Sequence, residues 1–219
     1  MAILELKNIQ YSYNRQKQVI RGADFAFEEG TLYALVGKSG AGKSTLLSLM
    51  AGLDLPDSGE VLFDGVPTGS MDLTDYRLSS VAVIYQDFEL FPLLTVLENI
   101  MYPMQLNGIS EKDSLSEAKR LAGKVSLPPE LYDRYPGELS GGEQQRVAIA
   151  RGLTMGRRLM LADEPTGNLD SENSDNIFNL LAGLAHEDGR CIIIVTHDLS
   201  IMDKADVVCR IVDGKIERR

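Results

Sequence analysis

Residues 37–45 read GKSGAGKST and match the pattern G-x-x-x-x-G-K-[ST]. The apolar run TLYALVG at 31–37 leads into them, and the helix-forming stretch TLLSLMAG at 45–52 follows. A glycine-rich turn between a strand and a helix lets backbone N–H groups close around phosphate oxygens, while Lys43 adds a positive charge and Ser44 offers a hydroxyl to magnesium. The stretch therefore predicts a phosphate-binding loop at the end of a buried strand.

Three further runs are equally short, apolar and rich in branched residues: VAVIYQ at 81–86, RLMLADE at 158–164 and CIIIVTH at 191–197. Such runs are typical of buried parallel strands. Each ends in polar side chains, namely Gln86, Asp163 with Glu164, and His197. Ligands bind at the carboxyl ends of the strands in open α/β sheets, so we expect these groups to gather beside the loop. There, one carboxylate can hold magnesium and the other can polarise an attacking water.

Other segments frame this α/β core. Strand-like patterns at 3–13, 23–30 and 59–65 predict a smaller, partly antiparallel sheet. Between Gln86 and Leu139 the pattern becomes helical, with a capping box at Ser110 and Asp113 and with apolar residues repeating on one face at Leu115, Ala118, Leu121, Ala122 and Val125. This pattern predicts a helical subdomain inserted into the sheet domain, and 219 residues suit one domain in all.

The composition limits the partners that we expect. Lys and Arg number 22 against 32 Asp and Glu, and a net charge of −10 argues against a nucleic-acid partner. No apolar run is long enough to span a bilayer, and the opening MAILELKNIQ lacks the pattern of a signal peptide, so we expect a cytosolic protein. Cys191 and Cys209 have no metal or disulfide spacing and are predicted to be buried core residues.

The stretch LSGGEQQRVAIARGL at 139–153 holds a second potential phosphate site. Its Ser-Gly-Gly turn opens a helix, and such a turn points free backbone N–H groups and the positive end of the helix dipole at one spot. One small chain thus carries two features that suit the same ligand.

The order of these features resembles the ATP-binding subunits of ABC transporters over essentially the whole chain: an aromatic, the glycine loop, a glutamine, LSGGE, an Asp-Glu strand end and a histidine. The resemblance implies a P-loop NTPase of the α/β class with a mostly parallel core sheet, a small antiparallel β subdomain and an inserted helical subdomain at about 87–138. It further implies a single ABC-type ATPase domain over 1–219. DEPTGNLD at 163–170 and YPGELSGGEQQRVAIARGL at 135–153 are similar to the branch of lipoprotein-releasing, macrolide-exporting, peptide-antibiotic-resistance and cell-division ATPases.

The resemblance also implies roles for individual residues. Tyr13, with Tyr11 as its nearest competitor, would stack on adenine. The phosphates would be held by the loop residues Gly37, Lys38, Ser39, Gly40, Ala41, Gly42, Lys43, Ser44 and Thr45. Magnesium would be served by Ser44, Gln86 and Asp163. Glu164 resembles the general base, His197 resembles the residue that contacts the γ-phosphate, and Asp170 would cross towards a partner subunit.

The two phosphate sites become compatible if two copies share each ATP. Lys43 would hold the γ-phosphate from one side, and the signature residues of a second copy, Ser140, Gly141, Gly142 and Glu143, would hold it from the other. The family's head-to-tail dimer implies this geometry, with closure on two ATP as the power stroke and hydrolysis reopening the pair.

The leading prediction is therefore a magnesium-dependent ATPase that drives an integral membrane permease from the cytoplasmic face of the membrane. The helical subdomain would contact the permease, through segments such as FELFPLLTVLENI at 88–100. Two alternatives stay open: a soluble ABC-type ATPase acting on nucleic acid or ribosomes, and a regulator of an extracytoplasmic enzyme through a membrane partner. The transported substrate and the direction of transport do not follow from the residues.

Overall fold

A computed structural model describes residues 2–13, 17–197 and 199–218 of the chain. These residues form two compact units. The first comprises Met1–Val83, Arg158–Glu164 and Leu181–Arg219, and the second comprises Ile84–Arg157 and Pro165–Leu180. The expectation of one domain over 1–219 with a helical subdomain at 87–138 stays a prediction, and the second unit includes that stretch and continues beyond it.

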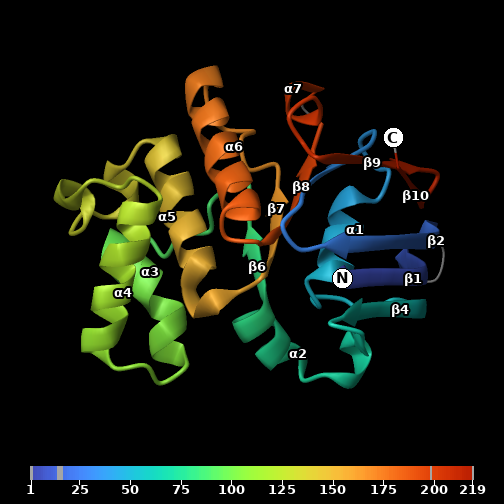
Figure 1. Cartoon of the computed structure of the whole chain (residues 1–219), viewed down its shortest axis with the longest axis horizontal. Helices are drawn as coiled ribbons and strands as arrows, with labels where there is room; N and C mark the ends of the chain where they lie inside the picture. The colour runs from blue at the N-terminus through green and yellow to red at the C-terminus, as the bar shows by residue number, and fades with distance from the viewer. Residues whose placement is uncertain (1, 14–16, 198, 219) are drawn as a thin grey trace. The chain divides into compact units, whose positions relative to one another are not determined.

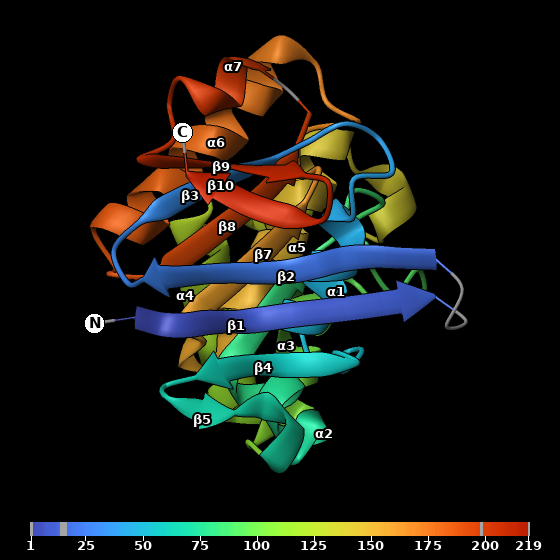
Figure 2. The ribbon, with the colours of Figure 1, turned by 90° about the vertical axis from the view of Figure 1, so that its right-hand side faces the viewer.

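The first unit contains a six-stranded sheet of order β10-β9-β3-β8-β7-β6 (Figure 1, Figure 2). Its strands are β3 (Leu32–Val36), β6 (Val81–Ile84), β7 (Leu159–Asp163), β8 (Cys191–Thr196), β9 (Val207–Val212) and β10 (Lys215–Arg218). β3 pairs in parallel with β8 and β9, and β7 pairs in parallel with β8. The four apolar runs of the sequence are thus confirmed as strands of a mostly parallel sheet.

The β9–β10 hairpin was not predicted. Its two strands are antiparallel and are joined by Asp213 and Gly214, both at positive φ (49° and 77°). An Asp-Gly pair between short apolar runs is a hairpin signal, so the sequence did contain the necessary information.

A second, antiparallel sheet of the same unit has the order β2-β1-β4-β5 (Figure 2). Its strands are β1 (Ala2–Tyr13), β2 (Lys17–Glu28), β4 (Ser58–Phe63) and β5 (Val66–Pro67). Side chains from both sheets and from α1 (Lys43–Met50) join one apolar cluster, whose fully buried members include Phe27, Leu35, Leu46 and Ile193. Burial of these faces fixes α1 against the sheet end from which the glycine loop emerges.

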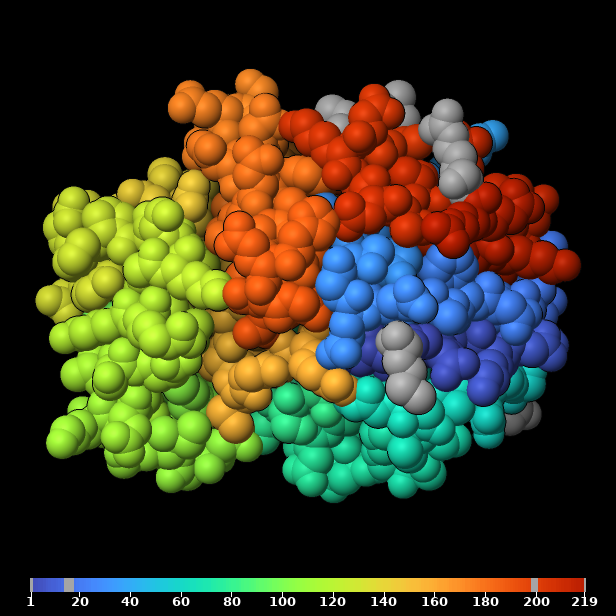
Figure 3. Space-filling view, in the orientation of Figure 1, coloured from blue at the N-terminus to red at the C-terminus, as the bar shows by residue number. Residues whose placement is uncertain are grey.

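The second unit is helical. It contains α3 (Val96–Leu106), α4 (Glu111–Lys124), α5 (Gly141–Leu153) and the beginning of α6 (Ser171–His186). α3, α4 and α5 pack on one another, and the green and yellow-green atoms of α3 and α4 form one continuous surface in Figure 3. Thr95 and Glu98 form a capping box at the start of α3, and Ser110 caps α4. The helical pattern predicted after Gln86 is confirmed.

Short elements complete the described chain: η1 (Thr68–Ser70), α2 (Leu73–Asp75), η2 (Tyr76–Ser80), η3 (Pro129–Leu131), η4 (Pro136–Glu138), η5 (Thr154–Gly156) and α7 (Leu199–Met202). Cys191 and Cys209 are buried free thiols, as predicted, and burial raises the pKa of the Cys209 thiol to about 12.

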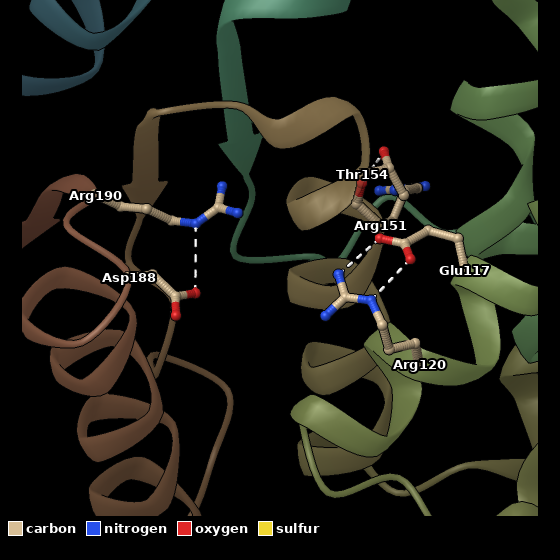
Figure 4. Close-up of polar contacts among 6 residues, drawn as sticks. All are labelled: Glu117, Arg120, Arg151, Thr154, Asp188 and Arg190. Carbon is tan, nitrogen blue, oxygen red and sulfur yellow. Dashed lines mark hydrogen bonds and ion pairs between the residues drawn. The ribbon is translucent and has the colours of Figure 1, made fainter.

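Two ion pairs are drawn in Figure 4, one in each unit. On α4, Arg120 bonds Glu117 through two nitrogens at 2.7 and 2.8 Å, and these bonds lower the pKa of Glu117. In the first unit, Asp188 and Arg190 lie 3.7 Å apart before β8.

Gly59 provides a test of the antiparallel sheet. It has φ +82°, and an added Cβ would lie 2.3 Å from the carbonyl oxygen of Asn8 and 2.4 Å from that of Lys7, where the β1–β4 register is irregular. Gly59→Ala should therefore lower the free energy of unfolding by about 3 kcal/mol or more, since backbone cannot yield as a side chain does. Urea unfolding followed by circular dichroism measures it.

Gly65→Ala is the matched control. Gly65 has φ +77°, and no atom of the residues that the structure describes would lie within 4 Å of an added Cβ, so only backbone strain of about 1–2 kcal/mol is expected. Equal losses in the two variants would contradict the packing described for Gly59.

Candidate nucleotide-binding site

The glycine loop runs from β3 to α1 in the first unit, and two of its glycines are closely surrounded by other segments. Gly42 is the N-cap of α1 at φ +102°, where an added Cβ would lie 2.8 Å from Ile20 Cδ1 and 2.9 Å from Val19 Cγ1. At Gly37 a Cβ would lie 3.0 Å from the carbonyl oxygen of Ile211. No side chain in the described part of the chain caps α1, so the first N–H groups of this helix are available to an anion.

Lys43 lies within the curve of this loop. Its ammonium nitrogen donates to the carbonyl oxygen of Gly37 at 2.9 Å and to that of Lys38 at 3.4 Å. The loop thus surrounds a positive charge with its own carbonyls, and this charge can move to a phosphate oxygen when one enters.

Ser44 and Asp163 are neighbours across the site. Burial raises the pKa of Asp163, and so does the adjacent Glu164, while a side-chain hydrogen bond from Ser44 and the charge of Lys43 lower it. A hydroxyl beside a carboxylate suits Mg²⁺, which takes few protein oxygens and completes its shell with phosphates and water. Among the described residues no group of three or more His, Cys, Asp or Glu is placed to hold a metal alone, so the fit to magnesium depends on phosphate oxygens as well.

Glu164 and His197 meet at the ends of neighbouring strands. Glu164 has φ +47°, a strained conformation for this residue, and its N–H donates to the carbonyl oxygen of Val195 at 2.8 Å. Its Oε2 lies 2.6 Å from Nδ1 of His197, whose side chain is 74% exposed. The backbone thus directs the Glu164 carboxylate towards the exposed imidazole, and backbone strain of this kind is common at catalytic positions.

Tyr13 reaches the loop from the antiparallel sheet. Its hydroxyl lies 3.0 Å from Oγ1 of Thr45, while its ring meets that of Tyr11 edge-to-face at 5.3 Å. Because 48% of Tyr13 is exposed, it retains surface on which a flat ring could stack.

A cavity of about 760 Å³ borders one flank of the loop. It is lined by residues 37–41, His197 and parts of β2 and the β9–β10 hairpin, but its lining does not include Lys43, Ser44 or Tyr13. The cavity therefore accounts for only part of the predicted site.

The signature turn belongs to the second unit. Ser140 is the N-cap of α5 and forms a capping box: its N–H and its hydroxyl both donate to Oε2 of Glu143, at 2.7 and 2.8 Å. At Gly141 an added Cβ would lie 3.2 Å from Leu169 Cδ2, and at Gly142 it would lie 2.7 Å from Asn173 Oδ1. Neighbouring side chains of the same chain thus pack closely against both glycines.

Gln86 and Asp170 also lie in the second unit. The Gln86 amide donates to Oδ1 of Asn168 at 3.3 Å. Asp170 caps α6, because its carboxylate accepts from the N–H and the side-chain amide of Asn173, both at 2.9 Å, and these bonds lower its pKa. The predicted residues thus fall into two sets: Tyr13, the loop, Asp163, Glu164 and His197 in the first unit, and Gln86, Ser140–Glu143 and Asp170 in the second. Their roles remain predictions.

Two contacts near Gln86 were missed from the sequence. Asn168 binds Gln86 across 82 positions of the chain, and Arg151 donates to the carbonyls of Phe88 and Glu89. The only available signal for Asn168 was its place in GNLD beside Asp170, and no spacing rule links it to Gln86.

The family model described as "ABC transporter" matches residues 20–167. The chain is 42% identical to the lipoprotein-releasing system ATP-binding protein LolD 2 of Rhodopirellula baltica, over 98% of this chain and 89% of the relative. The chain belongs to the ABC transporter family. It is the ATP-binding subunit of such a transporter.

Other relatives of this subunit are also ABC transporter ATP-binding proteins. LolD of Geobacter metallireducens is 40% identical over 98% of both chains, and the uncharacterized ABC transporter ATP-binding protein YbbA of Escherichia coli K12 is 40% identical over 98% of this chain and 96% of the relative. The predicted membership of the lipoprotein-releasing branch is confirmed.

Solved structures give the same fold. A dimeric structure of MJ0796, described as a bacterial ABC transporter cassette, matches with a TM-score of 0.88 and 35% identity over 98% of this chain and 97% of MJ0796. A second dimeric structure of MJ0796, in a post-hydrolysis state bound to ADP and Pi, matches at 0.88 and 34%, with the same coverage. The predicted fold class is confirmed. Within the described residues of the ABC subunit, none of the helices has the length and apolar character needed to cross a bilayer.

Asp163→Asn should stabilise the nucleotide-free chain at neutral pH. The pKa of Asp163 is raised, so the folded chain binds the carboxyl proton more tightly than the unfolded chain does. Ionised Asp163 therefore lowers the stability of the fold at pH values above the folded pKa, and this loss of stability disappears below the unfolded pKa. At pH 7.5 the melting temperature should rise by about 2–4 °C for each kcal/mol relieved. The gain should shrink as the pH falls towards about 4.

Differential scanning calorimetry across this pH range, with the exposed Asp203→Asn as control, measures the effect. A gain in melting temperature that does not vary with pH, or a loss of stability at pH 7.5, would contradict the raised pKa of Asp163.

Proposed function

We propose that two copies of the chain close around two ATP molecules and that hydrolysis of this ATP drives a membrane permease. The observation that carries the proposal is the pair of phosphate-binding features in one chain: the uncapped start of α1 in the first unit and the Ser140–Gly142 turn at the start of α5 in the second. Each ATP would use the loop of one copy and the turn of the other. The dimeric structures of MJ0796, one with ADP and Pi, support this arrangement.

Within each shared site the loop residues 37–45 would bind the phosphates, with Lys43 leaving its own loop carbonyls for a phosphate oxygen. Tyr13 would stack on the adenine. Ser44 and Asp163 would hold Mg²⁺ with Gln86, and the ion would supply positive charge to the β- and γ-phosphates.

Glu164 would accept the proton of the attacking water. Its contact with His197 Nδ1 at 2.6 Å orients the carboxylate, and entry of a γ-phosphate would draw the exposed imidazole towards the ligand. Because phosphoryl transfer depends mainly on positioning and charge, a site lacking the second copy's turn should bind ATP yet turn it over slowly.

The permease would dock on the second unit, which would place the subunit at the cytoplasmic face of the membrane. The segment after Gln86 exposes apolar side chains, with Phe91 at 40% and Leu93 at 86%. Leu93 is held in this exposed loop by Asn99, whose amide donates to the carbonyls of Phe91 and Leu94 at 3.1 and 2.9 Å. A fixed apolar projection of this kind is typical of a protein–protein contact.

Glu164→Gln should trap an ATP-bound dimer, because an amide cannot accept the proton of the attacking water. Turnover should fall by about 10²–10⁴-fold, while size-exclusion chromatography with ATP and Mg²⁺ shows a dimer. Glu187→Gln, at an exposed residue that follows α6, is the matched control and should behave as the unaltered chain. Turnover at the original rate in Glu164→Gln would exclude Glu164 as the base.

Ser140→Arg should abolish turnover and leave ATP binding by the monomer nearly intact, since Ser140 serves a neighbour's nucleotide. Ser110→Arg is the control, because it also removes a helix N-cap of the second unit and costs a similar ~1 kcal/mol of stability. Equilibrium binding of a fluorescent ATP analogue at low protein concentration, alongside a phosphate-release assay, separates the two effects. Equal loss of monomer binding in Ser140→Arg would show that Ser140 serves its own chain.

A further inference from the structure

Three segments of the second unit meet at the start of α5. They are the turn Gln86–Glu89, the stretch Asn168–Asp170 and the signature turn itself. An added Cβ at Gly141 would lie 3.2 Å from Leu169 Cδ2, 3.7 Å from the carbonyl oxygen of Asn168 and 3.8 Å from Phe88 Cζ. The stretch that leads to Asp170 and the turn that carries Gln86 are thus packed against the same glycine.

The side chain of Asn168 links these two segments directly. Its amide nitrogen donates to the carbonyl oxygen of Gln86 at 3.1 Å and to Oδ1 of Asp87 at 3.2 Å, and its Oδ1 accepts from Nε2 of Gln86 at 3.3 Å. Only this orientation of the Asn168 amide is consistent, because the reverse would place its oxygen against two other oxygens. Asn168 therefore bonds both the backbone carbonyl and the side-chain amide of Gln86.

The far half of the same turn is held from α5. Phe88 and Glu89 adopt φ +63° and +49°, which disfavours both residues, and Arg151 donates to their carbonyl oxygens at 3.0 and 2.7 Å. The hydroxyl of Thr154 donates to the carbonyl oxygen of Arg151 at 2.7 Å (Figure 4). Arg151 and Asn168 thus hold the turn together: Arg151 bonds its far half, and Asn168 bonds the backbone and the side chain of Gln86.

We propose that Asn168 is a positioning residue for Gln86. Its side chain couples the orientation of the Gln86 amide to the position of the stretch that ends at Asp170. The proposal rests on the proposed function, in which Gln86 serves magnesium and Asp170 approaches the second copy. In that site Asn168 would act through Gln86 and would bind neither the nucleotide nor the metal. A shift of the 168–170 stretch on closure would pass to Gln86 through the Asn168 side chain, so the arrival of the partner would orient the Gln86 amide.

The first test uses the nucleotide-free chain and Asn168→Ala. Within the turn, the N–H of Phe88 donates to the carbonyl oxygen of Tyr85 at 3.2 Å, and that of Glu89 donates to that of Asp87 at 2.7 Å. Hydrogen–deuterium exchange of these two amides should become about three- to tenfold faster in the variant, because the turn loses the bonds that Asn168 supplies. Asn107→Ala, which removes one bond to Pro103 at the end of α3, is the matched control and should leave these amides unchanged.

The second test is a double-mutant cycle with Gln86→Ala, read as the Mg²⁺ concentration that half-saturates turnover. Asn168→Ala should raise this concentration about three- to tenfold in the otherwise unaltered chain, with little change in the KM for ATP at saturating Mg²⁺. In the Gln86→Ala background it should add nothing, because the residue acts only through Gln86. A merely structural loss would add in both backgrounds.

Unchanged exchange of the turn in Asn168→Ala, or additive effects in the cycle, would overturn the proposal. If Gln86→Ala alone leaves the Mg²⁺ dependence unaltered, the magnesium role of Gln86 fails. The exchange measurement still decides whether Asn168 holds the turn, so the two failures are distinguishable.

Discussion

The backbone at Gly42, at φ +102°, passes so close to Val19 and Ile20 that an added Cβ would lie within 2.9 Å of both, and a Cβ at Gly37 would lie 3.0 Å from the carbonyl oxygen of Ile211. The loop between β3 and α1 lies against these segments, the Lys43 ammonium donates to its Gly37 carbonyl oxygen, and no side chain of the described residues caps the first turn of α1. Since an uncapped helix start attracts anions, the geometry of the loop follows from where its glycines must lie. Ser44 and Asp163 then meet because α1 begins beside the end of β7.

Two adjacent carboxylates carry negative charge at the site. The chain carries a net charge of −10, and it places Asp163 and Glu164 side by side in a half-buried position where the first has a raised pKa. The nucleotide-free protein thus retains an electrostatic cost at the place where magnesium is expected. Sites that function by binding a cation commonly carry such a cost, because residues chosen for the ligand are not optimal for stability.

The sequence predicted those features that depend on local pattern. The four apolar strands were identified because burial on both faces leaves a continuous apolar run, and the loop at 37–45 was identified because phosphate binding demands glycines at fixed spacing. Helix α4 was predicted from its cap and its apolar stripe, both of which are short-range signals. The β9–β10 hairpin was missed although Asp213 and Gly214 offered a turn signal.

Contacts between distant segments could not be predicted in this way. Asn168 binds Gln86 only because the fold brings positions 86 and 168 together, and neither residue type nor spacing records that meeting. Similarly, Leu169 and Asn173 pack closely on the signature glycines Gly141 and Gly142. Nothing in the sequence pattern indicates this packing.

The central claim is that each ATP is shared between two copies, and a cross-linking measurement tests it most directly. One chain carries both Ser140→Cys and Lys43→Ala, so that it offers a thiol at the signature turn but has a weakened loop; the second chain is unaltered. An ATP analogue with a thiol-reactive group on its γ-phosphate is added, and mass spectrometry identifies the labelled residue. The account predicts that Ser140→Cys is labelled only when the unaltered chain is present, and labelling of the altered chain alone, to the same extent, would contradict it.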